Sequence, residues 1–246
     1  MDRLIYTAMS GANAAASRQA VLSNNLANAS TNGFRAELST YRAVPLQGEG
    51  ASTRVFAVEA TAGYLDRPGP AQRTDRSMDV MANGSAWFSV QALDGTEAYT
   101  RNGQLEVSTE GTIVSGSGLP ILSSGSAPMT VPPGATLSIG SDGTVSAKVG
   151  TQPANSLGRL KMVTPSGDDP LKRGADGLFR AASGEPLPND ETAKLQAGVL
   201  EGSNVNAIEA MVGMIQTARQ FETQMRLLQT AESNDRSAGQ LLGLQG

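Results

Sequence analysis

The sequence predicts an α+β protein whose N- and C-terminal helices form a coiled-coil-like stalk, with a mainly antiparallel β body inserted between them. Three observations predict this fold. Near both ends of the chain, apolar residues recur at steps of three and four, which is the period of a helix seam. Between the ends the period changes to two. Asn-Gly and Asp-Gly pairs interrupt this middle region at close spacing, as tight hairpin turns do.

These changes of period divide the chain into three parts. Residues 1–34 hold the N-terminal helix and an Asn-rich segment that leads away from it. Residues 35–200 form the β-rich body, and residues 201–246 hold the C-terminal helix. We expect the two helical parts to lie together as an inner core.

The first helix is predicted from a seam of mostly small side chains. The seam residues are Ile5, Ala8, Ala12, Ala15, Gln19, Leu22 and Leu26. Before Arg35 the only charged residues are Asp2, Arg3 and Arg18. Because a solitary surface helix normally carries a charged face, this helix is better suited to being surrounded by protein. An amphipathic helix docked on its own domain fits the same pattern.

The segment from Asn24 to Phe34 predicts how the first helix ends. Asn and Gly tolerate left-handed backbone angles, and amide side chains can bond free backbone groups. We therefore expect a helix end and a sharp change of chain direction here. An ordinary helix C-cap is compatible with the same residues.

The β body is predicted from short strand-like runs separated by turn pairs. The runs are residues 87–93, 97–101, 104–108, 112–114, 136–139, 144–149, 159–164 and 178–181, and the pairs are Asn83-Gly84, Asp94-Gly95, Asn102-Gly103, Asp142-Gly143 and Asp176-Gly177. Such spacing is typical of an antiparallel sandwich or barrel. The Gly/Ser/Pro-rich tract 115–134 is a surface loop or a boundary, and Trp87 and Phe88 are expected in the core. Arg101 either pairs across the sheet or faces a neighbouring subunit.

The second helix is predicted to begin at Asn206, because Glu209 follows three residues later, as in a helix cap. Its seam comprises Ile208, Met211, Ile215, Ala218, Met225 and Leu228. This seam is large where the first is small, so one supplies holes that the other fills. We expect the helices to pack together with Ala15 and Ala218 in the contact, and the seams to join many copies of the chain.

Composition excludes most catalytic and ligand chemistry. The 246 residues contain no Cys and no His, which removes thiolate nucleophiles, the usual general base and the usual zinc ligands. No catalytic motif is present, and Asp168-Asp169 is interpreted as part of a solvated loop. We therefore expect no enzyme activity, no cofactor, no metal and no small-molecule substrate. The net charge of −4 argues against nucleic-acid binding, and no apolar run is long enough for membrane insertion.

Three ordered motifs resemble the rod and hook family of flagellar axial proteins. The first contains Asn24, Asn25, Leu26, Ala27, Asn28, Thr31, Gly33 and Phe34, followed by Arg35. The second is residues 98–103, and the third is residues 200–206 leading into 211–215. The resemblance spans nearly the whole chain. A hook protein would carry a much larger body, so the length favours a rod subunit.

The resemblance implies a structural subunit of the proximal rod that polymerises helically through its terminal helices to form a torque-transmitting axle. The implied partners are copies of itself, other flagellar rod proteins and the flagellar type III export apparatus. The implied location is the periplasm-spanning rod of the basal body, reached without a cleaved signal peptide. Two alternatives stay open: another rod subunit such as the distal rod protein, and a secreted monomeric β-domain binding module.

Overall fold

The computed structural model describes residues 2–45 and 55–243 of the chain. Its contacts divide the chain into two compact units. The helical unit comprises Met1–Ala29, Ala36–Leu65 and Val205–Gly246, and the β unit comprises Ser30–Arg35 and Asp66–Asn204. The chain therefore passes between the two units four times.

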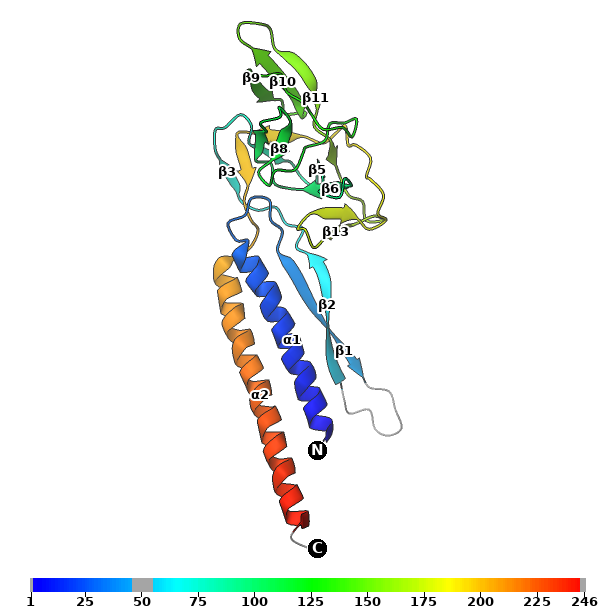
Figure 1. Cartoon of the computed structure of the whole chain (residues 1–246), viewed down its shortest axis with the longest axis vertical. Coiled ribbons are helices and arrows are strands. Elements are labelled where there is room, and N and C mark those ends of the chain that lie inside the picture. The colour runs from blue at the N-terminus through cyan, green and yellow to red at the C-terminus, as the bar shows by residue number, and fades with distance from the viewer. Residues whose placement is uncertain (1, 46–54, 244–246) are drawn as a thin grey trace. The chain divides into compact units, whose positions relative to one another are not determined.

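Two helices dominate the helical unit (Figure 1). Helix α1 spans Asp2–Ala27 and helix α2 spans Ala207–Gly243, with lengths of about 39 and 56 Å at 1.5 Å per residue. A Cβ atom placed on Gly11 would lie 3.0 Å from Gln224 Cδ, and one placed on Gly213 would lie 3.2 Å from Leu22 Cδ1. Since the partner number falls as the α1 number rises, the helices run antiparallel. Among the described residues, no helix is long and apolar enough to cross a membrane.

A long hairpin also belongs to the helical unit. Strands β1 (Glu37–Pro45) and β2 (Val55–Tyr64) pair antiparallel, and both contact α1. From the change of period at residue 35, these residues are expected in the β body, where the sequence predicts no strand before residue 87. The difference arises because Asn25 of α1 binds the backbone where β1 begins, as described below.

The β unit is built from short antiparallel strands. They are β3 (Ala71–Arg73), β4 (Val80–Ala82), β5 (Trp87–Gln91), β6 (Glu97–Thr100), β7 (Leu105–Val107), β8 (Ile113–Ser115), β9 (Ala135–Ile139), β10 (Thr144–Val149), β11 (Asn155–Arg159), β12 (Met162–Val163), β13 (Leu171–Arg173), β14 (Phe179–Ala181), β15 (Leu195–Ala197) and β16 (Val199–Glu201). The largest sheet has the order β12-β5-β6-β14-β13, and a second has the order β11-β10-β9. Three two-stranded sheets, β15-β4, β16-β3 and β7-β8, complete the unit. The α+β class is thus confirmed.

One apolar core fills the β unit. It includes residues of a tract that the sequence predicts to be a surface loop or a boundary. Trp87 and Phe88 are fully buried, as predicted. The tract 115–134 is neither a surface loop nor a boundary, because Ile121 and Met129 belong to the core. Ile121 also forms a β-bridge with Val90 of β5. Gly, Ser and Pro set the turns of this tract, while its few apolar residues point inward.

Turn chemistry explains most of the predicted hairpins. Gly95, Gly143 and Gly177 join β5 to β6, β9 to β10 and β13 to β14, and each has a positive φ between 79° and 85°. Gly103 is required for another reason. A Cβ atom there would lie 1.7 Å from the Val80 carbonyl oxygen, so only glycine permits this approach of two chain segments.

Candidate functional site: the helix pair and the buried charges beside the unit boundary

The Asn-rich segment ends α1 and ties it to the hairpin. The Asn28 amide donates to the Asn24 carbonyl at 2.9 Å. The Asn25 amide donates to the Glu37 carbonyl at 2.9 Å, and its oxygen accepts from the Glu37 N–H at 2.8 Å. Asn25 therefore pairs with the first residue of β1 as a neighbouring strand would. Amide bonding at this helix end is confirmed, and Gly33 has the expected positive φ of 71°.

The seam of α1 is covered within its own chain. Ala8, Ala12 and Ala15 are buried, with Ala15 only 2% exposed. Ile5, Leu22, Leu26 and Gln19 are half-buried. Helix α1 contacts α2 and both strands of the hairpin, so these small side chains lie where other elements approach it.

The seam predicted on α2 lies mostly on the exposed side of that helix. Ile208 is 69% exposed and Ile215 is 54% exposed. Met211, Ala218 and Met225 are exposed as well, and Leu228 is half-buried. The idea that large α2 side chains fill holes between the α1 alanines is therefore wrong within one chain. The cap at Asn206 is confirmed, since its side-chain oxygen accepts from the Ile208 and Glu209 N–H groups at 3.1 and 3.3 Å.

A different stripe of α2 is buried in the helical unit. Its buried members are small, namely Ala210, Thr217 and Ala231, and Gly213 lies against Leu22 of α1. These positions also recur at helical spacing, but Ala210 is two residues from Ile208, or roughly 200° around the helix. Small side chains let the two helix backbones approach closely, and the large apolar side chains remain outside.

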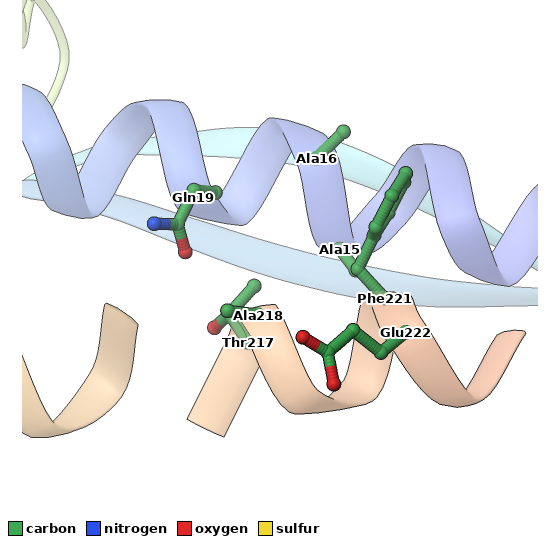
Figure 2. A pocket seen from close by; sticks show the side chains of 7 residues that line it. All are labelled: Ala15, Ala16, Gln19, Thr217, Ala218, Phe221 and Glu222. Carbon is green, nitrogen blue, oxygen red and sulfur yellow. The ribbon is translucent and has the colours of Figure 1, made fainter. Parts of the chain in front are cut away.

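An open cavity of roughly 370 Å³ lies between the two helices. Figure 2 shows its lining of Ala15, Ala16, Gln19, Thr217, Ala218, Phe221 and Glu222. Ala15 and Ala218, expected in one contact, thus line the same cavity. The buried Gln19 Oε1 has no hydrogen-bond partner among the described residues.

The cavity adjoins exposed apolar side chains of both helices. Ala218 lies three residues from Ile215 on α2, and Ala16 lies two turns after the exposed Met9 on α1. We define the outer face as the exposed residues Tyr6, Met9, Ala16, Ile208, Met211, Ile215, Ala218 and Met225. Large apolar side chains exposed along a helix are candidates for contact with other proteins.

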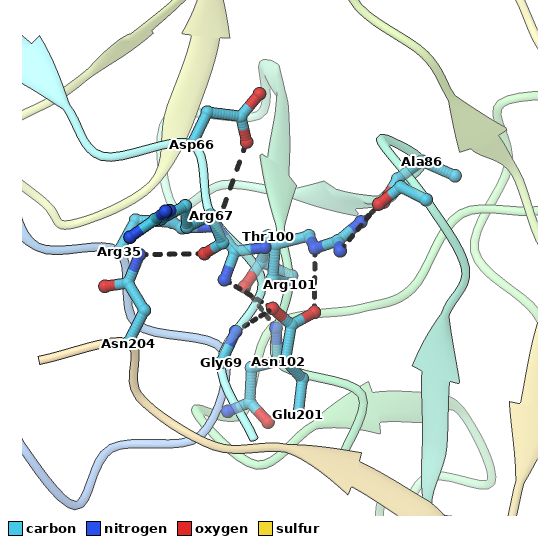
Figure 3. A network of polar contacts seen from close by, with 11 residues as sticks. Arg35, Asp66, Arg67, Gly69, Ala86, Thr100, Arg101, Asn102, Glu201 and Asn204 are labelled. Carbon is cyan, nitrogen blue, oxygen red and sulfur yellow. Dashed lines mark hydrogen bonds and ion pairs between the residues drawn. The ribbon is translucent and has the colours of Figure 1, made fainter. Parts of the chain in front are cut away.

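A buried ionic cluster occupies the β unit close to the points where the chain leaves it (Figure 3). Glu201 Oε1 accepts from Arg35 Nη1 and from the Gly69 N–H, the latter at 3.0 Å. Glu201 Oε2 accepts from Arg101 Nε at 2.9 Å. The side chains of Glu201, Arg35 and Arg101 are at most 2% exposed. Arg35 Nε also lies 4.0 Å from Asp66 Oδ1.

Arg101 has a buried role that the sequence leaves undecided. Besides Glu201, its guanidinium donates to the Ala86 carbonyl and, at 2.9 Å, to the Gly84 carbonyl. Burial lowers the pKa of Arg101, and the neighbouring Glu201 carboxylate opposes that shift. The Arg35 and Arg101 guanidinium carbons lie 5.9 and 5.7 Å from the centre of the Trp87 ring, within cation–π range.

Backbone contacts hold the neighbouring segments side by side. The Gly33 N–H donates to the Glu201 carbonyl at 2.7 Å, and the Asn204 N–H donates to the Phe34 carbonyl at 3.2 Å. The Asn204 side chain donates to the Arg67 carbonyl at 2.8 Å. A Cβ atom on Gly33 would lie 2.3 Å from the Arg101 carbonyl carbon, so this position requires glycine.

The residues that make this cluster lie in or directly after the three sequence motifs; the sequence leaves two roles open for Arg101 and predicts none for Arg35 and Glu201. Arg35 follows Gly33-Phe34, Arg101 lies in residues 98–103, and Glu201 lies in residues 200–206. A single charged residue among glycines, asparagines and apolar residues is the signal that could have singled them out. Their separations of 166 and 100 residues from Glu201 hide the contact from any local pattern.

The remaining acidic residues of the described part of the chain lie in no cluster of three or more that could bind a metal ion. Asp168 is exposed and Asp169 is half-buried, and the Asp169 carboxylate accepts from the Ser183 N–H and hydroxyl. These two bonds lower the pKa of Asp169, which keeps it charged in a turn contact.

Three protein-family models match the chain in the expected order. The flagella basal body rod protein model matches residues 5–35. The model of the flagellar hook protein FlgE/F/G D1 domain matches residues 81–147. The model of the flagellar basal body rod FlgEFG protein C-terminal region matches residues 196–241. The first and third contain the two helices, and the second contains most strands of the core.

Full-length relatives agree with these matches. The chain is 43% identical to the flagellar basal-body rod protein FlgF of Escherichia coli K12, over 99% of this chain and 100% of the relative. Identity and coverage are the same for FlgF of Salmonella typhimurium LT2. Identity falls to 33% with the rod protein FlgG of Buchnera aphidicola from Schizaphis graminum, over 90% of this chain and 92% of the relative. The chain therefore belongs to the FlgF family of flagellar basal-body rod proteins, and it is a structural subunit of the rod and not an enzyme.

Proposed function

We propose that the chain enters the rod by packing its outer face against the helices of neighbouring subunits. The supporting observation is that α2 leaves Ile208, Met211 and Ile215 exposed while burying small residues. Burial of one such side chain contributes about 1.5–3 kcal/mol, and the gain recurs in every subunit of a polymer. The cavity between the helices is a socket for side chains of the neighbour.

The predicted seams then have two separate tasks. The α1 seam of Ile5, Ala8, Ala12, Ala15, Leu22 and Leu26 holds α1 to its own unit. The α2 seam of Ile208, Met211, Ile215, Ala218 and Met225 serves neighbouring subunits, with Leu228 at its edge. In the rod, helices α1 and α2 of the terminal parts 1–34 and 201–246 form a coiled-coil-like stalk at the inner core, and the β unit lies outside it.

The partners in this proposal are copies of the chain and other rod proteins, arranged helically to form an axle that transmits torque. The chain reaches the periplasm-spanning rod through the flagellar type III export apparatus, without a cleaved signal peptide. Its Cys-free composition suits passage into an oxidising compartment. A nearly uncharged N-terminal helix and a Met-rich C-terminal helix suit repeated contacts between similar helices.

The test compares Ile215→Asp with Gln216→Asp, which are adjacent exposed positions of α2. Each variant would replace the chain in cells that lack it, and swimming and rod completion would be measured. We expect Ile215→Asp to stop rod completion, because a neighbour would have to bury an unpaired charge. Gln216→Asp adds the same charge outside the seam and should support swimming.

The purified monomers provide the control for folding. Because both side chains are exposed, helix content and the unfolding midpoint should match those of the unmodified chain. Equal motility with both variants, or equal loss with both, would reject the outer face as the assembly surface.

A further inference from the structure

The buried cluster of Glu201, Arg35 and Arg101 lies next to the places where the chain leaves the β unit. Arg35 is the last residue of the first β-unit segment, and Asp66 is the first residue of the second. Glu201 precedes the end of the second segment at Asn204 by three residues. One cluster therefore collects side chains from beside three of the four points at which the chain changes unit.

The chemistry of this cluster makes it resistant to partial opening. Glu201 uses both carboxylate oxygens, and its three donors come from Arg35, Gly69 and Arg101. If one segment moved away, a guanidinium or a carboxylate would stay buried without its partner, which is far more costly than the loss of a surface ion pair. The segments around Gly33 and Asn204 must therefore stay or leave together.

We propose that Glu201, with Arg35 and Arg101, is a junction lock that fixes the spacing of the two segments leading to the terminal helices, and that rod assembly requires it. The segment 30–35 follows α1, and the segment 199–204 precedes α2. Glu201 acts here as a positioning residue, because its side chain is fully buried in the β unit and acts through the segments that it holds. The assembly part of this inference rests on the proposed function, whereas the local part concerns the monomer alone.

The test uses Glu201→Gln and a matched control, Glu97→Gln. Glu97 is also buried in the β unit, where it accepts from Lys161 Nζ at 2.8 Å. Both variants turn a buried carboxylate into an amide, but Glu97 lies in strand β6 of the central sheet, away from the segments that change unit. Any difference between them therefore reflects position and not charge.

Two measurements on the purified full chain report on the lock directly. Amide hydrogen exchange follows residues 30–35 and 199–204, where the Gly33 and Asn204 N–H groups are hydrogen-bonded. Fluorescence follows Trp87, the only tryptophan, which lies within 6 Å of both guanidinium groups. We expect Glu201→Gln to speed exchange in both segments at least about tenfold and to change Trp87 emission. Glu97→Gln should not change how fast residues 30–35 and 199–204 exchange relative to the core of the β unit.

In cells, Glu201→Gln should lose rod completion while Glu97→Gln retains it. The local part of the lock is refuted if the two variants exchange equally at residues 30–35 and 199–204. The assembly part is refuted if Glu201→Gln opens these segments yet completes rods. If Glu201→Gln does not fold, Arg101→Lys keeps the charge but cannot reach Glu201, Ala86 and Gly84 together. Normal exchange in that variant would also refute the lock.

The same measurements separate this inference from the assembly surface. Ile215→Asp should lose rod completion with unchanged exchange at residues 30–35 and 199–204. If Ile215→Asp completes rods while Glu201→Gln still opens these segments, the outer face is wrong and the lock stands in the monomer.

Discussion

The β unit and the helical unit bury different kinds of side chain. In the β unit the fully buried residues are large, including Phe88, Leu105, Ile113 and Leu160. In the helix pair the buried residues are mostly alanines, and the large residues Ile208 and Ile215 are exposed. The β unit thus completes an apolar core with its own residues, while the helices keep their apolar side chains available.

Polar groups follow the same division. The β unit encloses two ionic clusters, around Glu201 and around Glu97, whose partners are all in that unit. The helical unit has the exposed pair Arg236–Glu232 on α2, and the buried Gln19 Oε1 faces an open cavity without a partner in the described part of the chain. The β unit thus satisfies its buried charges with its own residues, whereas in our proposal neighbouring subunits complete the helical unit.

Truncating one apolar side chain in each unit should give the largest difference in stability between the β unit and the helical unit. Phe88→Ala should lower the free energy of unfolding of the β unit by about 3–5 kcal/mol, because it opens a cavity in a packed core. Ile208→Ala should lower that of the helical unit by less than about 0.5 kcal/mol, because the side chain is already in water. Trp87 fluorescence and helical circular dichroism follow the two units during denaturation. Equal losses would show that α2 buries Ile208 in the monomer.

Enlarging a side chain in the helix pair tests how closely the helices approach. Ala12→Leu should destabilise the helical unit by about 1–3 kcal/mol, since Ala12 is buried where packed elements meet. Ala16→Leu, on the exposed side and beside the cavity, has room and should leave stability unchanged. Thermal melts followed by circular dichroism distinguish the two. Tolerance of Ala12→Leu would contradict close packing along the α1 seam.

Alkaline pH should weaken the β unit before the helical unit. Burial raises the pKa of Tyr99 from 10.0 to about 12, and its hydroxyl oxygen accepts from the Leu187 N–H at 2.6 Å. Since the folded state holds the proton more tightly, stability is complete below pH 10. It should fall by on the order of 1 kcal/mol per pH unit between pH 10 and about 12. Denaturant titrations of Tyr99→Phe should show a smaller decline over this range.

Acid should have the smallest effect, through a turn of the β unit. Hydrogen bonds from Thr164 and Thr192 lower the pKa of Asp190 from 3.8 to about 2. The folded state therefore favours the charged form, and this stability is complete above pH 3.8 and lost as pH falls towards 2. The loss should stay below about 1 kcal/mol, because solvent screens a partly exposed group. In Asp190→Asn, unfolding midpoints should vary less with pH over this interval.

Local patterns were sufficient for the helices and for most turns. The three/four period predicts both helices, and Asn206 caps α2 because its side chain reaches N–H groups only two and three residues away. Asp-Gly pairs predict hairpins since glycine permits the positive φ found at Gly95, Gly143 and Gly177. Even so, the residues of β1 and β2 are expected in the β body and lie in the helical unit, because period alone does not say which surface a segment contacts.

By itself the sequence determined the α+β class, the end of α1, the start of α2, most turns and the absence of Cys and His chemistry, because each depends on residues close together in the chain or on composition alone. Only the tertiary structure decided which stripe of α2 meets α1. Two stripes of α2 share the helical period. The stripe of small side chains is buried because it allows the backbones of the two helices to approach closely. The tertiary structure likewise decided that Arg35 and Arg101 meet Glu201 across 166 and 100 residues. A buried charge needs an oppositely charged partner, and the fold can bring that partner from any distance along the chain. Residue spacing in the sequence therefore does not predict the pair.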